Sequence, residues 1–264
     1  MVKNEHRAYD LLGNIAIVKF PRDLNQKQKK KYALELMKKQ KSIKTVLEKT
    51  GRVKGRLRIH STKFIAGEKI KEVLYRENNC TFRFNVDKTY FSPRLSNERK
   101  EIAGLVKKGD EILVMFAGVG PFSIVIAKNS KAGKVYSNEL NRFANKYARL
   151  NAELNVVKDK IVFLDGDIKR AAQRLKKQNK TFDLIVMPRP QLKDSFLKEA
   201  FTLSKKGTRI FYYDFCESDK EKEIVEKIKN EAKKIGKKIK VLKIKHAGEI
   251  APYKFRVRVD FKIL

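Results

Sequence analysis

The chain has two different patterns of hydrophobic and polar positions. From Leu95 onward, short apolar runs rich in β-branched residues alternate with amphipathic stretches long enough to form helices. Such alternation is typical of parallel strands whose connecting helices cover both faces of one sheet, so it predicts an α/β fold. The predicted strands are residues 111–116, 134–138, 160–164, 182–187, 208–213, 239–246 and 254–262, and the last predicted helix is residues 217–236.

The last two strands define the predicted topology. No helix separates residues 239–246 from residues 254–262, so these strands are expected to form an antiparallel hairpin at the end of the sheet. A seven-stranded sheet that ends in such a hairpin is the Class I (Rossmann-like) methyltransferase layout, which a dinucleotide-binding domain does not share. We therefore predict a domain of this class over residues 94–264.

The first part of the chain is organised differently. Residues 11–20 alternate and are rich in β-branched types, which predicts a strand, and the lysine-rich residues 22–40 carry apolar positions at helical spacing. Short strand candidates with glycine breaks follow, without the long helices that parallel strands require. A small α+β domain is therefore predicted over residues 1–93.

The charge of the chain points to a polyanionic partner. Its 264 residues include 63 Lys and Arg against 30 Asp and Glu, a formal net charge of +33. Fifteen basic residues and only three acids lie between Lys19 and Arg58. Such an excess attracts polyanions, so nucleic acid is the expected partner. A solvated helix face, the lysine-rich surface of a hyperthermophile and a membrane-surface protein are the alternative explanations.

Cysteine content and hydropathy indicate the cellular compartment in which the protein is expected. Cys80 and Cys216 are too far apart for a CxxC metal site, so no metal is expected, and they give no disulfide framework unless they are assumed to be close. The N-terminal residues lack the apolar core of a signal peptide, and the longest apolar run, residues 112–127, is interrupted by glycine and proline. A cytoplasmic protein without a membrane span is expected.

A glycine turn follows the first strand of the predicted sheet. In "VMFAGVGPFSIVIAK", residues 114–128, an apolar strand runs into Gly118 and Gly120, and Pro121 begins a helix. Glycine lets the backbone approach a ligand closely, and proline suits the first turn of a helix. This layout can seat a nucleotide-like cofactor, although a lone GxG is a weak signal.

Acids at the next two strand ends strengthen that signal. Glu139 lies 21 residues after Gly118, where a carboxylate can accept from both hydroxyls of a ribose. Asp167 follows the third strand, where it can meet the amino group of an adenine, and Asp165 is the weaker candidate. An acid at a helix N-terminus is the alternative role for each. The predicted cofactor-binding residues are Phe116, Ala117, Gly118, Val119, Gly120, Glu139, Leu140, Asp167 and Met187.

The turn also limits which cofactor fits. It lacks the GK[ST] sequence that cradles a triphosphate, and without a third glycine its spacing is loose for a nicotinamide dinucleotide. Sites for S-adenosylmethionine often carry a carboxylate at this strand end, where the chain has Val114 followed by Met115. We still expect S-adenosylmethionine, with its amino-acid end held by the backbone of residues 116–120.

Several segments resemble the archaeal and eukaryotic tRNA guanine-37 N1-methyltransferases, and "FSPRLSNER", residues 91–99, is the most specific. The resemblance implies methylation of N1 of guanine 37 in the anticodon stem-loop of tRNA, and a monomer is expected. Family members usually carry a further N-terminal domain that grips the tRNA elbow, and we expect the positive charge to compensate for it here. The other segments are "YDLLGNIAIVKF", "KSIKTVLEKTGRVKGRLRIH", "YRENNCTFRFNVDKTYFSPRLSNER", "MFAGVGPFSI" and "APYKFRVRVDF".

The resemblance also implies roles for single residues. N1 of guanine is protonated near neutral pH, so the reaction needs a base and a group that stabilises charge on O6. Glu98 matches the proposed general base of the family, Arg58 the arginine near O6, and Arg94 a residue that positions the substrate. A helix-terminal acid and ordinary phosphate contacts are the alternative roles. The predicted substrate-binding residues are Arg56, Arg94, Pro188, Arg189 and Pro190.

One segment departs from the pattern of the family. "FDLIVMPRP" has Pro188 where methyltransferases that act on planar nitrogen typically have the Asn of Asn-x-Pro. Because proline offers no side-chain acceptor, the backbone carbonyl of Met187 or Pro188 is expected to take that role. Some archaeal members of the family also methylate C7 of 4-demethylwyosine in the wyosine pathway. Their sequences depart from the usual pattern in this loop. A second activity of this kind is therefore a hypothesis for the chain.

Two other functions stay open on the sequence alone. An aminocarboxypropyl transferase of the wyosine pathway would share the cofactor turn, although it is not expected to keep the whole of "FSPRLSNER". A catalytically inert tRNA-binding protein would explain why Val114 replaces an acid and Pro188 replaces an asparagine.

Overall fold

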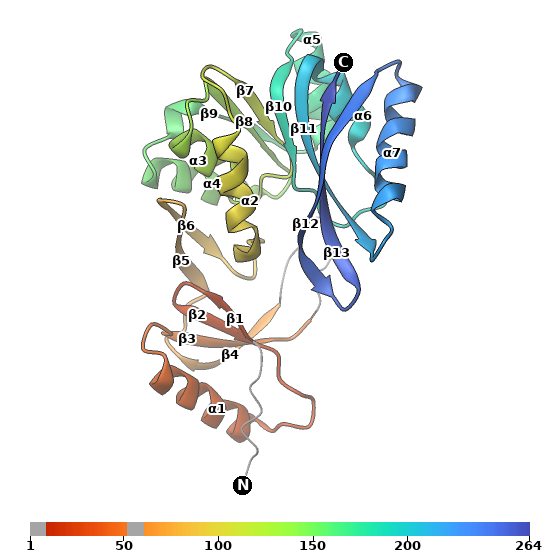
Figure 1. Cartoon of the computed structure of the whole chain (residues 1–264). Helices are drawn as coiled ribbons and strands as arrows, with labels where there is room; N and C mark the ends of the chain where they lie inside the picture. Colours follow the sequence, from red (N-terminus) through yellow and green to blue (C-terminus); the bar gives the residue numbers. More distant parts are fainter. Residues whose placement is uncertain (1–8, 52–60) are drawn as a thin grey trace.

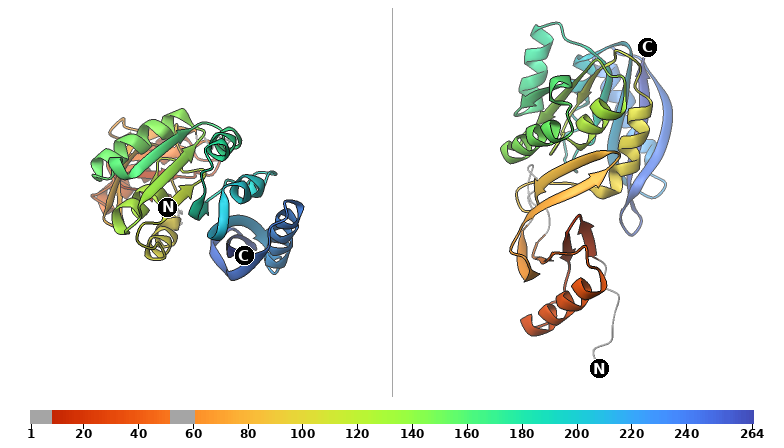
Figure 2. Two further views of the ribbon diagram at one scale, coloured as in Figure 1. Left: turned by 90° about the horizontal axis from the view of Figure 1, so that it is seen from above. Right: turned by 90° about the vertical axis from the view of Figure 1, so that its left-hand side faces the viewer.

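The computed structural model of the chain describes residues 9–51 and 61–264 (Figure 1). A small four-stranded sheet lies near the N-terminus, and a seven-stranded sheet forms the larger part of the molecule. A two-stranded hairpin lies between them (Figure 1, Figure 2). The predicted fold, an α/β domain with a seven-stranded sheet preceded by a small α+β domain, is confirmed.

The small sheet is covered on one face by a single helix, which joins its two parallel strands. Asn25 precedes this helix and accepts from the backbone amide of Gln28 in a capping box, so the helix begins later than the predicted residue 22. In spatial order the elements are β1 (Tyr9–Leu12), β2 (Ile15–Val18), β3 (Thr45–Lys49) and β4 (Thr62–Gly67), with the helix α1 (Gln26–Lys39).

The single strand predicted over residues 11–20 is wrong, because the chain turns at Gly13 and makes two antiparallel strands. Gly13 has a φ of 57°, and a Cβ there would lie 2.1 Å from the carbonyl oxygen of Leu74. The turn therefore requires glycine at this position. The alternating pattern did not reveal it, since apolar residues continue on both sides of the turn.

The hairpin of β5 (Glu72–Glu77) and β6 (Cys80–Asn85) packs on α4 (Arg142–Leu154). The side-chain amide of Asn151 bonds to both the N–H and the C=O of Arg83, as a neighbouring strand would. Apolar side chains of β6 also belong to the core that lies under the large sheet. The hairpin is thus fixed to the large domain, while the division at residues 93 and 94 stays a prediction.

The large sheet has five parallel strands and a C-terminal antiparallel hairpin. Its strands in spatial order are β12 (Ile239–Ala251), β13 (Lys254–Ile263), β11 (Ser204–Glu217), β10 (Phe182–Met187), β7 (Glu111–Val114), β8 (Lys134–Glu139) and β9 (Ile161–Asp165).

Helices cover both faces of this sheet, and each face has its own apolar core (Figure 2). None of the described helices is long and apolar enough to cross a membrane. One face is covered by α2 (Ser96–Gly104), α3 (Pro121–Asn129) and α4, and the other by α5 (Ile168–Lys177), α6 (Leu197–Thr202) and α7 (Glu221–Lys234); short 3-10 helices η1 (Pro93–Leu95) and η2 (Lys158–Lys160) complete the domain.

Three strands differ from the prediction by more than one residue, and one of them is β12, which continues beyond the predicted residue 246 to Ala251. The strand predicted over residues 111–116 ends at Val114, because Phe116 has a φ of 59° and already belongs to the turn. The strand predicted over residues 208–213 is longer at both ends, since β11 pairs with β10 on one side and with β13 on the other. β7 lies between β8 and β10, so the order of strands reverses there and opens a crevice at their carboxyl ends.

Candidate active site

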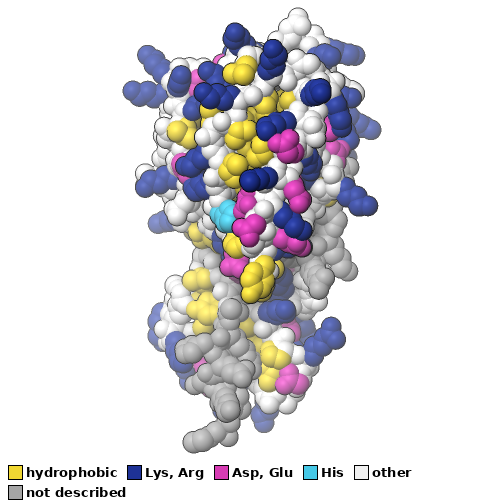
Figure 3. Space-filling view, turned by 45° about the vertical axis from the view of Figure 1, so that its right-hand side comes forward, with side chains coloured by type: hydrophobic (Ala, Val, Ile, Leu, Met, Phe, Trp, Pro, Cys, Tyr) yellow, Lys and Arg dark blue, Asp and Glu magenta, His cyan; other side chains and the backbone are white. Residues whose placement is uncertain are grey.

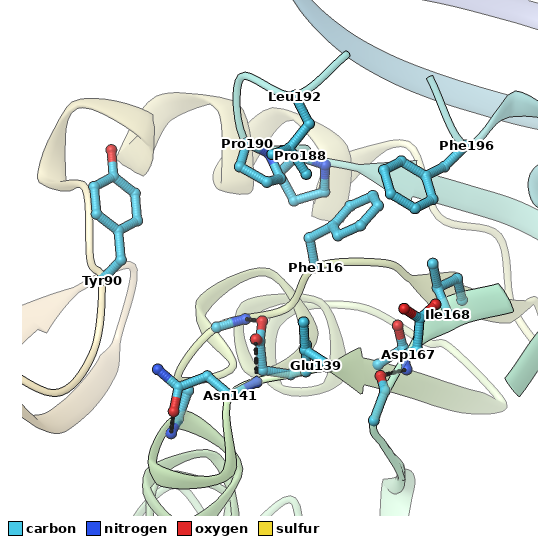
Figure 4. Close-up of a pocket in the computed structure, with 15 residues that line it drawn as sticks. Tyr90, Phe116, Glu139, Asn141, Asp167, Ile168, Pro188, Pro190, Leu192 and Phe196 are labelled. Carbon is cyan, nitrogen blue, oxygen red and sulfur yellow. Dashed lines mark hydrogen bonds between the residues drawn. The ribbon is translucent and has the colours of Figure 1, made fainter. Parts of the chain in front are cut away.

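A pocket opens in this crevice, at the carboxyl ends of β7, β8, β9 and β10 (Figure 4). Polar groups from the ends of β8 and β9 lie on one side of it, and apolar side chains from the loop after β10 lie on the other. The predicted site residues that line it are Phe116, Gly118, Glu139, Leu140, Asp167, Pro188 and Pro190.

The glycine turn holds its shape through left-handed backbone and a bond to Glu139. Gly118 has a φ of 59° and Gly120, which precedes α3, a φ of 86°. The amide of Gly118 donates to Oε2 of Glu139 at 2.7 Å. Ala117 and Val119 are buried beneath the turn, so their predicted contribution to a cofactor site is to shape the backbone.

Glu139 is a fixed acceptor at the centre of the pocket. Its Oε1 accepts from the amide of Asn141 at 2.7 Å, and its Oε2 accepts from Gly118. Desolvation raises the pKa of Glu139 above its usual 4.5, while backbone amides, those of Asn141 and Gly118 foremost, oppose the rise. Each oxygen of an ionised carboxylate has a second lone pair, so both can still accept from a ligand hydroxyl.

Asp167 lies at the far end of the same pocket (Figure 4). It caps α5, and its Oδ1 accepts from the amide of Lys169 at 2.8 Å. Asp165 instead forms an ion pair with Arg149, with Oδ1 2.9 Å from Nη2, and does not line the pocket. Asp167 is therefore the acid that can reach a ligand here.

Two residues of the apolar wall of the pocket, Leu192 and Phe196, were not predicted from sequence. Phe116 and Phe196 meet edge to face with ring centroids 5.0 Å apart, and Leu192 lies beside them (Figure 4). Phe196 and Leu192 come from the irregular segment between β10 and α6, which has no periodicity that could mark them. The fixed acceptor, the open glycine turn and this apolar wall fit the ribose, amino-acid and adenine parts of S-adenosylmethionine.

The segment after β10 places its two prolines in the pocket wall and its arginine in the protein interior. Pro188 and Pro190 line the pocket, whereas the guanidinium of Arg189 is buried and forms an ion pair with Asp214 of β11. Arg189 also donates to the carbonyls of Leu192 and Asp194, and so holds the segment closed. This placement differs from the predicted contact of Arg189 with substrate, because the side chain turns inward to neutralise a buried carboxylate.

Met187 is a buried residue at the end of β10 and does not line the pocket. Its side chain belongs to the core on the α5, α6 and α7 face. Its carbonyl already accepts from the amide of Arg189 at 2.7 Å. The predicted use of this carbonyl as a substitute for asparagine would therefore have to compete with a bond that shapes the segment.

Glu98 is buried on α2 in a cluster of charged groups. Its Oε2 accepts from Nη1 of Arg258 at 2.6 Å and from the hydroxyl of Tyr213 at 2.9 Å, and its Oε1 lies 2.7 Å from Nζ of Lys245. Burial raises the pKa of Tyr213 well above 10, so this hydroxyl stays protonated and donates. The paired Glu98 does not line the cofactor pocket, and Arg56 and Arg58 lie outside the described residues.

A second cavity of about 370 Å³ lies where the small and large domains meet. Its walls come from β1, β2 and β3, from β6 and the segment after it up to Arg94, and from β11, β12 and β13. Arg94 lines it, with Nη2 3.3 Å from Oδ1 of Asp10. Tyr90 lines both this cavity and the cofactor pocket, so the two sites are neighbours.

The surface carries the excess of positive charge. Lys and Arg side chains cover much of the face shown in Figure 3, on both domains, and acids gather near its middle. On α1 the exposed lysines include Lys27, Lys30 and Lys31, whereas Lys29 is buried and paired with Glu48 at 2.5 Å. Only the exposed lysines are available to a polyanion.

Comparison with known proteins places the chain in a family. A model of the TRM5/TYW2 methyltransferase domain matches residues 73–242, and a model of the TYW2 N-terminal domain matches residues 1–70. The chain belongs to the TRM5/TYW2 methyltransferase family. As a member of this family it is a methyltransferase, and the resemblance noted in the sequence is confirmed.

Similar proteins have related names. The tRNA (guanine(37)-N(1))-methyltransferase Trm5b of Pyrococcus abyssi is 34% identical over 97% of this chain and 74% of its own length. The tRNA (guanine(37)-N(1))/4-demethylwyosine(37)-methyltransferase Taw22 of Nanoarchaeum equitans is 33% identical over 97% of this chain and 100% of its own length. A solved complex of aTrm5 with tRNALeu is 29% identical, with a TM-score of 0.83, and covers 97% of this chain and 72% of that one.

Proposed function

We propose that the protein transfers a methyl group from S-adenosylmethionine to N1 of guanine 37 in tRNA. The observation that carries the proposal is the position of Tyr90, which lines both the cofactor pocket and the cavity between the domains. A base held in that cavity lies beside the cofactor. The names of the relatives from Pyrococcus abyssi and Nanoarchaeum equitans support this choice of substrate.

The residues of the pocket bind and orient the cofactor, which supplies an electrophilic methyl group on its sulfonium. Glu139 accepts from the ribose hydroxyls, Asp167 accepts from the adenine amino group, and the amino-acid end lies against the backbone of the glycine turn. No protein nucleophile is needed, because N1 attacks the methyl carbon in line and the thioether leaves. The protein must place N1 and remove its proton.

Glu98 is the proposed acceptor of that proton. Glu98 forms ion pairs with Arg258 and Lys245. The same two cations also pair with Glu101, 2.6 Å from Arg258 and 2.5 Å from Lys245. A second acid in the cluster allows Glu98 to take up a proton while the cations stay neutralised.

The test is mass spectrometry of nucleosides after reaction of unmodified tRNA with cofactor labelled in its methyl group. The proposal expects labelled 1-methylguanosine at position 37. Label in the aminocarboxypropyl part of the cofactor distinguishes the transferase alternative, since it reaches tRNA only in that reaction. Binding of tRNA without transfer of either label would favour the inert alternative.

A second activity, methylation of C7 of 4-demethylwyosine, is proposed for the same site. Two observations favour it: the Nanoarchaeum equitans relative is named for both activities, and Pro188 and Pro190 line the pocket where an asparagine would restrict the base. Reaction with tRNA that carries 4-demethylwyosine at position 37 tests this proposal. Failure to detect isowyosine would remove the second activity and leave the first.

The proposal also includes how the tRNA is bound: a single copy of the chain contacts the anticodon stem-loop. The cavity at the domain junction would receive nucleotide 37, and the exposed lysines of α1 would contact phosphates further along the tRNA. Light scattering with an anticodon stem-loop RNA tests both points. One protein and one RNA are expected per complex, and a complex with two proteins would contradict the monomer.

A further inference from the structure

The cavity between the domains contains a buried arginine without a partner. Arg256 of β13 lines this cavity, and only 8% of the residue is exposed. Within residues 9–51 and 61–264 it forms no hydrogen bond and no ion pair. Its guanidinium carbon lies over the ring of Phe215, 5.5 Å from the centroid.

Arg258, two residues further along the same strand, has the opposite surroundings. Residues two apart on a strand point to the same face, about 7 Å apart. Arg258 pairs with Glu98, Glu101 and Asp260, whereas Arg256 has none of these acids. Other ionisable groups at the cavity are Asp10, which pairs with Arg94, and Lys49 and the exposed Glu249.

The strand register places the two arginines in adjacent layers. Tyr213 pairs with Arg258, and Phe215 pairs with Arg256. The layer of Tyr213 and Arg258 holds Glu98, and the next layer, of Phe215 and Arg256, lies at the wall of the cavity. Arg256 therefore lies one layer along the strand from Arg258, the residue that pairs with the proposed base.

The N–H groups of Arg256 have no acceptor among the described residues and stay open to the cavity, since its nitrogens are not among the fully enclosed unpaired atoms. A guanidinium in such a partly desolvated wall gains from a charged acceptor. A negatively charged oxygen that enters the cavity would be such an acceptor. Stacking on Phe215 fixes the plane of the guanidinium and leaves its N–H groups free for such an oxygen.

We propose that Arg256 binds a negatively charged oxygen that the target nucleotide brings into the cavity. The inference rests on the proposed function and adds a residue to it. Two oxygens of the nucleotide have the required chemistry: a phosphate oxygen beside nucleotide 37, and O6 of guanine as the N1 proton leaves.

The test compares Arg256→Met and Arg256→Lys with the matched control Lys262→Met. Lys262 is an exposed lysine on the same strand and the same face, away from the cavity. For Arg256→Met we expect a loss of about tenfold or more in kcat/KM for tRNA, and for Arg256→Lys a smaller loss, because a lysine keeps the charge without the planar fork. Lys262→Met should stay within about twofold of wild type.

Thermal stability separates this role from a structural one. Arg256→Met should melt close to the wild-type temperature and should bind S-adenosylmethionine normally, because the guanidinium has no hydrogen bond or ion pair to lose and methionine keeps an apolar contact with Phe215. A structural role predicts a lower melting temperature. A variant that melts lower and loses activity in step with its folded fraction would overturn the proposal.

The two oxygens are told apart with tRNA that carries neutral methylphosphonate linkages beside nucleotide 37. If Arg256 binds phosphate, Arg256→Met weakens tRNA binding, and the difference from wild type disappears on this RNA. If it binds O6, tRNA affinity is unchanged and the single-turnover rate falls on both RNAs. Equality of Arg256→Met and Lys262→Met in rate and affinity would overturn the proposal.

Failure of the proposed function has a separate signature. If the wild-type protein transfers no methyl group to guanine 37, that function is wrong. The affinity measurements then still decide the inference, and a dissociation constant of Arg256→Met equal to that of Lys262→Met on unmodified tRNA would overturn it.

Discussion

The cofactor pocket and the cavity between the domains are built in different ways. The pocket is formed almost entirely by successive strand ends of one sheet, and its main acceptor, Glu139, is held by backbone amides of the turn it faces. The cavity is formed by strands from both domains and has an unpaired cation in its wall. The pocket is therefore ready for its ligand, whereas the cavity becomes electrostatically complete only with a polyanion.

The largest expected effect concerns the core beneath the cofactor pocket. Val114 is fully buried in the core beneath the glycine turn and does not line the pocket, so an acid there cannot meet the ammonium of the cofactor. Val114→Asp should cost about 3 kcal/mol or more in unfolding free energy, because it buries a carboxyl without a partner. Thermal unfolding measures this loss, with Val114→Ile as the control. A stable Val114→Asp protein that binds S-adenosylmethionine more tightly would contradict the account.

The next effect concerns the charged cluster between the two sites. Glu98→Gln keeps the shape of the side chain and removes its basicity, so the single-turnover rate should fall by about 100-fold while cofactor affinity stays the same. Rapid-quench measurement with saturating tRNA tests this. Glu153→Gln, an exposed acid of α4 that pairs with Lys158 away from both sites, is the control and should keep the wild-type rate. A near-normal rate for Glu98→Gln would show that the base lies elsewhere.

A smaller effect sharpens the role of the pocket. Glu139→Gln should weaken S-adenosylmethionine binding by about tenfold and leave tRNA binding unchanged, because one acceptor of the ribose becomes a donor. Desolvation raises the pKa of Glu139 above 4.5, so the wild-type affinity should fall as the pH decreases through that raised value and the carboxylate is lost. The variant should lack this pH dependence. Calorimetric titration with S-adenosylmethionine across this pH range checks both points. An unchanged affinity of the Glu139→Gln variant would contradict the assignment of Glu139 to the ribose.

The smallest effect concerns the surface of the small domain. Lys30→Met removes an exposed cation of α1 and should weaken tRNA binding by about two- to threefold, with a slope of log K against log salt that is shallower by about one. Lys29→Met is the contrasting variant, since Lys29 pairs with Glu48 and should lower the melting temperature. Filter binding at several salt concentrations distinguishes them. Identical salt slopes for Lys30→Met and wild type would exclude this contact.

The fold and the pocket were predictable where the signal is local. The parallel strands alternate with amphipathic helices, and Gly118, Glu139 and Asp167 follow consecutive strands, whose carboxyl ends meet at one edge of the sheet. The turn at Gly13 was missed, because its cause is the carbonyl of Leu74, sixty-one positions away in a different sheet. Local pattern carries no information on such an approach.

The cavity, the segment after β10 and the apolar wall of the pocket were less predictable for the same physical reason. Arg189 looked like a substrate contact, but its partner Asp214 lies on a strand formed 25 positions later. Arg256 and Arg258 are alternate residues of one strand, and only the placement of α2 decides that the acids meet Arg258. Phe196 and Leu192 come from an irregular segment whose side chains are directed by tertiary packing alone.

One measurement tests the central claim, that a base in the cavity between the domains is methylated by the cofactor in the neighbouring pocket. Methyl-labelled S-adenosylmethionine is reacted in a single turnover with unmodified tRNA and with the same tRNA carrying adenine at position 37. The account predicts one labelled methyl group per guanine-37 tRNA, recovered as 1-methylguanosine, and none on the adenine-37 tRNA. Equal labelling of the two tRNAs, or label on any other nucleotide, would contradict it.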